Sequence, residues 1–116
     1  MADVLVNAGE DFIVDQIDAF GTYYIAWGTG AGTTAKGDTT LFTEASESRV
    51  ATTDSQPSSD TMQWVATITA DGTKTITNAG VFDASTAGNL IVKGDHTGVA
   101  VVLNDQIEYT VTLQIT

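Results

Sequence analysis

The residues that could carry chemistry are few, and they stand in segments typical of turns. His96 is the only histidine, and a Ser or Thr nucleophile would need it as a general base, but no Gly-x-Ser-x-Gly elbow accompanies it. Gly32 and Gly37 have the spacing of a phosphate-binding loop, yet Asp38 stands where that loop requires a lysine. We therefore expect neither nucleophilic catalysis nor a nucleotide site.

Acidic side chains are the remaining candidates, because the chain has 15 of them against four basic ones. Glycosidase chemistry needs two facing carboxylates, and calcium needs several oxygen ligands at a loop such as Asp-x-Asp-x-Asp-Gly. That spacing is absent here, and several of the acids are dispersed over predicted turns (Asp71, Asp83, Asp95 and Asp105) or lie in the segment of residues 44–47. The sequence predicts no catalytic residue, no metal site and no cofactor. We expect the acidic side chains to form a solvated surface.

Charge and hydropathy exclude further classes. The net charge of −11 argues against nucleic-acid binding, and the four scattered cations (Lys36, Arg49, Lys74 and Lys93) form no patch for an anionic membrane. No apolar run approaches the roughly 20 residues of a membrane-spanning helix, and there is no cysteine. We expect a soluble, acidic, single-domain protein.

The elements that must position these residues are strands. The chain has 20 threonines and 11 glycines, a composition that favours pleated sheets and turns over helices. Residues 107–115 alternate strictly between apolar and polar, and residues 62–68 place Met62, Trp64, Ala66 and Ile68 on one face. We predict an all-β fold with eight or nine short antiparallel strands, arranged as a β-sandwich or a barrel. Residues 12–116 would form its single domain, preceded by an N-terminal strand or arm at residues 1–11.

Other segments give weaker expectations. Residues 12–17 and 23–27 read as strands, and Asp71-Gly72 reads as a tight hairpin turn. Residues 93–98 read as a polar turn, and residues 28–40 and 53–60 as long loops that are mobile unless a partner orders them. The best candidate helix, residues 41–48, has weak apolar periodicity.

Three groups of segments, taken together, match a pattern found in a known class of proteins. The first group is Tyr-Ile-Ala-Trp-Gly-Thr-Gly at residues 24–30, followed by Gly-Asp-Thr-Thr-Leu at residues 37–41. The second is Ile-Thr-Asn-Ala-Gly-Val-Phe-Asp at residues 76–83, followed by Gly-Asn-Leu-Ile-Val at residues 88–92. The third is the closing Asp-Gln-Ile-Glu-Tyr-Thr-Val-Thr-Leu at residues 105–113. This succession resembles small virion structural proteins of tailed bacteriophages. It is similar both to capsid decoration (cement) proteins and to β-rich modules of tail fibres and collars.

The resemblance implies a β-sandwich of jelly-roll type and a non-enzymatic virion protein that binds other virion proteins. Our leading expectation is that it decorates and stabilises the capsid, binds the major capsid protein on the outer surface, and resides in the host cytoplasm during assembly. The alternative is a tail-fibre, collar-associated or glycan-receptor-binding module. We also expect a homo-oligomer, a trimer rather than a dimer. The residues expected at the oligomer or capsid contact are Val4, Leu5, Val6, Tyr23, Ile25 and Trp27.

Overall fold

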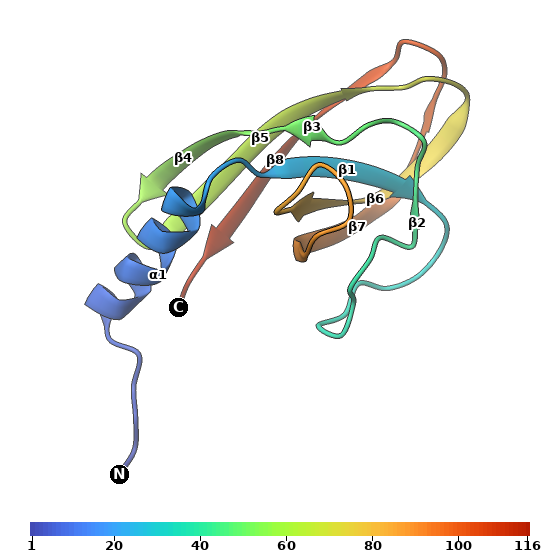
Figure 1. The fold of residues 1–116 in the computed structure, drawn as a ribbon. Helices are drawn as coiled ribbons and strands as arrows, with labels where there is room; N and C mark the ends of the chain where they lie inside the picture. Colours follow the sequence, from blue (N-terminus) through green and yellow to red (C-terminus); the bar gives the residue numbers. More distant parts are fainter.

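A computed structural model describes residues 1–116 and contains one helix and eight strands in two antiparallel sheets (Figure 1). In the first sheet the order is β2-β1-β6-β7, and β3 pairs with the other end of β1; in the second sheet the order is β4-β5-β8. The predicted all-β sandwich is thereby confirmed. The element bounds are α1 Asn7–Phe20, β1 Tyr24–Thr29, β2 Thr43–Glu44, β3 Val50–Ala51, β4 Thr53–Ser58, β5 Thr61–Thr69, β6 Lys74–Phe82, β7 Leu90–Val101 and β8 Gln106–Gln114.

A long two-stranded ribbon connects the two sheets. β5 pairs with β8 from Thr61–Gln114 to Thr69–Gln106, and β6 pairs with β7 in the same register from Lys74–Val101 to Ile76–Val99, beyond which the register shifts. Between them the ribbon turns a corner, where the Ala70 N–H donates to the Asp105 carbonyl over 2.7 Å and the Asn104 N–H donates to the Ala70 carbonyl. Bending one continuous hairpin in this way stacks its two halves as the layers of the sandwich.

The hydrophobic core lies between the layers. The inward face of β5 contributes Met62, Trp64, Ala66 and Ile68, all buried as the alternation predicts. They meet Ile25 and Trp27 of β1, Ile76, Ala79 and Val81 of β6, and Val14 of α1. A second small core on the outer face of the first sheet consists of Ala26, Leu41 and Phe82. β1 is therefore buried on both faces.

The N-terminal region corrects one strand prediction. Residues 12–17 are not a strand but belong to α1, which packs Val14 into the core and Ile17 against it. The helix ends where Gly21 adopts φ = 139°, a value that glycine tolerates and other residues rarely adopt. Residues 1–6 precede the helix without regular structure, and they extend away from the body (Figure 1). The division of the chain after residue 11 stays a prediction, although residues 7–11 are helical.

Three turn and loop predictions are also wrong. Residues 53–58 form β4 rather than a loop, and residues 93–98 continue β7 rather than turning. Asp71-Gly72 is not a hairpin turn, because β5 and β6 do not pair; it lies at the corner where the chain changes sheets. Residues 41–48, the best candidate helix of the sequence, form the short β2 and irregular chain.

Candidate functional site

The structure separates the predicted contact residues into two groups. Val4, Leu5 and Val6 are exposed by 80%, 50% and 62%. Tyr23, Ile25 and Trp27 are buried in the core, with at most 4% of each residue exposed, so the expectation that they form a contact surface is wrong. The reason is that β1 lies inside its sheet and is covered on both faces, which apolar alternation alone does not reveal.

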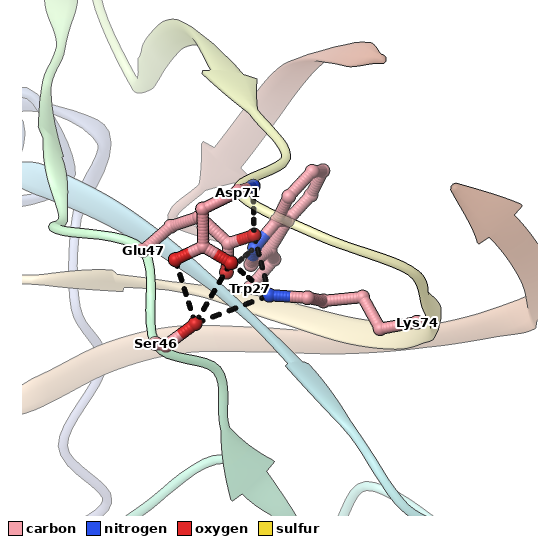
Figure 2. A network of polar contacts seen from close by, with 5 residues as sticks. All are labelled: Trp27, Ser46, Glu47, Asp71 and Lys74. Atoms are coloured by element: carbon pink, nitrogen blue, oxygen red, sulfur yellow. Dashed lines mark hydrogen bonds and ion pairs between the residues drawn. The ribbon is translucent and has the colours of Figure 1, made fainter. Parts of the chain in front are cut away.

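A polar network centred on Glu47 closes one side of the sandwich (Figure 2). The Trp27 indole Nε1 donates to Glu47 Oε1 over 2.8 Å, and Lys74 Nζ lies 2.6 Å from Glu47 Oε2. The Asp71 backbone N–H donates to the same carboxylate, while the Asp71 side chain accepts from Ser46 and Lys74. The network joins β1, the segment before β3, the β5–β6 corner and the start of β6.

The electrostatics of this network fix its charges. Burial raises the pKa of Glu47, but hydrogen bonds from Lys74 and Trp27 outweigh burial, so that pKa lies below its ordinary value. The hydrogen bond from Lys74 likewise lowers the pKa of Asp71. Burial lowers the pKa of Lys74, and the hydrogen bonds to Asp71 and Glu47 reverse this, so it is raised. All three groups are charged and paired near pH 7, which suits a structural clamp and leaves no carboxyl poised as a general acid.

Two further cations hold loops in the same manner. The Arg49 guanidinium lies 3.7 Å from the centre of the Phe82 ring, bonds both carboxylate oxygens of Glu44, and donates to the backbone carbonyls of Ala84 and Ala87. Lys93 Nζ lies 3.7 Å from the centre of the Phe42 ring and 2.8 Å from Asp38 Oδ2. Lys36 is the one cation of the four that forms no ion pair within the chain.

The glycine-rich loop that precedes β2 is fastened to the first sheet rather than arranged around an anion. Asn78, fully buried on β6, accepts from the Phe42 N–H and donates to the Thr29 carbonyl. The Thr34 N–H donates to Asp95 Oδ1 of β7, and Asp38 accepts from the Ala35 N–H within the loop. These carboxylates occupy the backbone donors that a phosphate would need.

The opposite side of the sandwich is open, because β7 and β8 are edge strands of different sheets. A groove runs between them, formed by two adjoining hollows of about 630 and 280 Å³ that share Val92 and Lys93. We call it the β7–β8 groove; residues 34–36 and 38 of the loop, residues 90–96 of β7 and residues 109–113 of β8 line it, together with Ala79. Ile107, Tyr109, Val111, Leu113 and Ile115 point toward the core, as predicted, but are only half-buried.

His96 lies in this groove, and both of its ring nitrogens are occupied. Nδ1 lies 2.8 Å from the Thr97 carbonyl, which can only accept, so Nδ1 carries the proton in the neutral ring. Nε2 then accepts from the Tyr109 hydroxyl at 2.9 Å. Burial raises the pKa of Tyr109 to about 12, which keeps that hydroxyl protonated. The pair bridges β7 and β8, and this arrangement provides no free lone pair for a general base.

No cluster of three or more His, Asp or Glu side chains is arranged to hold a metal ion. No helix combines the length and the apolar character that crossing a bilayer requires.

Comparison with known families places the chain. Residues 14–114 match the protein family described as Podophage GP4 fiber I protein gp80. The match begins inside α1 and includes every strand, whereas residues 1–13 lie outside it. Searches of curated proteins and of solved structures gave no significant match.

Proposed function

The chain belongs to the family of the podophage GP4 fiber I protein gp80, and from this premise we propose that it is a non-enzymatic structural subunit of a phage fibre. The family match over residues 14–114 is the observation that carries the proposal. It favours the tail-fibre reading of the sequence over the capsid-decoration reading, since the family description names a fibre protein.

The geometry supports a structural rather than a catalytic role. The acids most deeply engaged, Glu47 and Asp71, act as partners of Lys74, and the lone His96 is held by Thr97 and Tyr109. Trp27 and Trp64 are buried, so neither can stack on a sugar ring at the surface. The elongated body, with extents of 53, 26 and 23 Å, suits stacking or lateral assembly along a fibre.

We further propose that the subunit assembles with copies of itself, as a trimer rather than a dimer, within the virion. A body of 12.1 kDa offers few contact patches of the roughly 800 Å² per partner that a standard interface uses. Several copies around an axis would raise avidity without stronger individual contacts.

Capsid decoration is the second candidate, and the charge of the chain is the observation that favours it. A net charge of −11, with three of the four cations paired internally, suits an outer capsid surface that binds the major capsid protein and faces away from packaged DNA. Either role places the protein in the virion, and in the host cytoplasm during assembly.

Copy number and location in purified virions distinguish the two. We expect quantitative mass spectrometry to give a few copies to a few tens of copies per particle, and antibody-gold labelling to mark the tail or its fibres. Hundreds of copies with label over the head would overturn the fibre proposal in favour of decoration. Label on neither structure would overturn both.

A further inference from the structure

The four sheet edges differ in how well they are protected against pairing with another strand. β2 has only two residues, and β4 is short, contains Pro57 and has a register shift between Ser55 and Ser58. β7 contains Gly94 and Gly98 and shifts register near Asn78. Short length, proline, bulges and charged side chains, above all lysine, are the usual protections of an edge. β8 has only the single charged side chain of Glu108: its nine residues pair with β5 without a shift, and they include no proline, lysine or glycine.

The β8 edge also borders apolar surface that the chain leaves uncovered. Tyr109, Val111 and Leu113 are half-buried and line the β7–β8 groove, together with Leu90 and Val92 of β7. A strand added beside β8 would pair with its free backbone groups and cover these side chains in one step.

The chain carries a segment with the properties of such a strand. Residues 1–6 include Val4-Leu5-Val6, of which at least half of each residue is exposed, and Val6 already has extended backbone angles, φ = −79° and ψ = 163°. Figure 1 shows the segment pointing away from the body. Six extended residues span about 20 Å, two-thirds of the roughly 30 Å of the nine-residue β8.

Charge selects the same pairing. In a molecule of net charge −11, the charges that line the groove balance, since Lys36 and Lys93 oppose Asp38 and Asp95. Copies can therefore approach each other here without the repulsion that acts elsewhere. Lys36, the cation without an ion pair, lies at the groove. Its charge is complementary to that of Asp3 in the N-terminal segment, which also forms no ion pair within the chain.

We propose that residues 1–6 of one copy bind along β8 of a second copy and fill the β7–β8 groove. The contact is heterologous, because the arm and the groove are different surfaces of the same chain. Such contacts close into a ring when the rotation allows it, which is how the proposed trimer would form. The inference concerns subunit contacts only, so it does not depend on whether the virion location is a fibre or the capsid.

The first experiment measures oligomeric state by sedimentation velocity over a range of concentrations. We expect the full chain to associate, deletion of residues 1–6 to give monomers, and Val4→Asp to raise the dissociation constant by about tenfold or more, since it removes a buried apolar contact. Val102→Asp is the matched control, because Val102 is 54% exposed at the corner and outside the groove; its association should be unchanged. Circular dichroism of each variant verifies folding. Undiminished association after the deletion would overturn the proposal, and so would a full chain that is monomeric.

The second experiment locates the contact by disulfide trapping, which is clean because the chain has no cysteine. A mixture of Val4→Cys and Leu113→Cys proteins should form a cross-linked heterodimer, whereas Val4→Cys mixed with Val102→Cys should not. A self-linked Leu113→Cys dimer that forms as readily as the heterodimer would show pairing of β8 with β8 and overturn the arm. An intramolecular link in the Val4→Cys/Leu113→Cys double variant at nanomolar concentration would show that the arm binds its own groove, and would overturn exchange between copies.

Discussion

The two long sides of the sandwich differ in how far loops and side chains cover the edges of the sheets. On the β1 side, the segment of residues 30–48 is fastened by Glu47, Arg49 and Asn78, and four consecutive residues of β1 are buried. On the β7–β8 side residues 34–36 and 38 line part of the groove, but no strand pairs with the free edge of β8, and β8 alternates between exposed and half-buried along its whole length. Three of the four cations are used to hold loops, and the fourth lies at the open groove. The comparison teaches that the closed side maintains the fold, and that the open side is available for assembly.

The largest effect should come from the closed side. Trp27→Ala removes a fully buried side chain and leaves Glu47 without its indole donor, so we expect the free energy of unfolding to fall by about 3–5 kcal/mol. Chemical denaturation monitored by the remaining Trp64 measures this loss. A loss below about 1 kcal/mol would show that the closed side does not maintain the fold.

The clamp itself should give the next effect. In Glu47→Gln, Lys74, whose side chain is 15% exposed, keeps only Asp71 as its charged partner, and we expect a loss of about 1–3 kcal/mol. Glu44→Gln is the matched control, because the Glu44 side chain, which pairs with Arg49, is 36% exposed whereas that of Glu47 is 5% exposed; pairs with a solvent-exposed partner contribute about 0–1 kcal/mol. Equal losses in thermal or urea denaturation of the two variants would contradict the distinction between a buried clamp and a surface pair.

The open side should respond less. Leu113→Ala removes a half-buried side chain, so in the monomeric deletion variant we expect a loss of about 1–2 kcal/mol, roughly half that of full burial. Urea denaturation in the same background as Trp27→Ala gives a direct comparison. A loss below about 0.5 kcal/mol would mean that the inward face of β8 is assigned wrongly.

The smallest effect concerns pH. The folded-state pKa values of Glu47 and Asp71 lie below their ordinary values of 4.5 and 3.8, so their contribution to stability is full above those values and is lost as the pH falls through the lower folded values. Asp54 acts in the opposite direction, because burial raises its pKa. We expect the melting temperature to drop as the pH falls from about 5 to below about 3, and to drop less in Glu47→Gln/Asp71→Asn. An identical pH profile in that variant would show that Glu47 and Asp71 do not cause the loss of stability at low pH.

Local patterns predicted the strands whose two faces differ. β5 and β8 were found from alternation because one face is apolar and the other polar. β6 was not recognised as one strand, since its pairing shifts between Ile76 and Asn78 and the inward face changes there from even to odd positions. β7 was divided for a related reason: Gly94 and Gly98 read as turn residues, although the continuous pairing with β6 holds them in a strand.

The helix α1 and the burial of the predicted contact residues could not be predicted from composition. Residues 12–17 are rich in β-branched side chains and read as a strand, but Val14 and Ile17 have helical spacing, and Gly21 marks the helix end. Those two signals could have identified α1. The structure leaves Val4–Val6 exposed, and their role as a contact stays a prediction, whereas the burial of Tyr23, Ile25 and Trp27 depends on which strand becomes central, a matter of long-range pairing.

The central claim, that the open β8 edge is an assembly surface and the closed side a purely structural one, is tested most directly by hydrogen–deuterium exchange. The measurement compares the full chain with the chain lacking residues 1–6, at a concentration where the full chain is assembled. Peptides from β1 and β6 should exchange slowly in both proteins, because their backbone bonds lie inside the sheet. The β8 peptide should be protected in the full chain and exchange faster after the deletion. Equal protection of β8 in the two proteins would contradict the account.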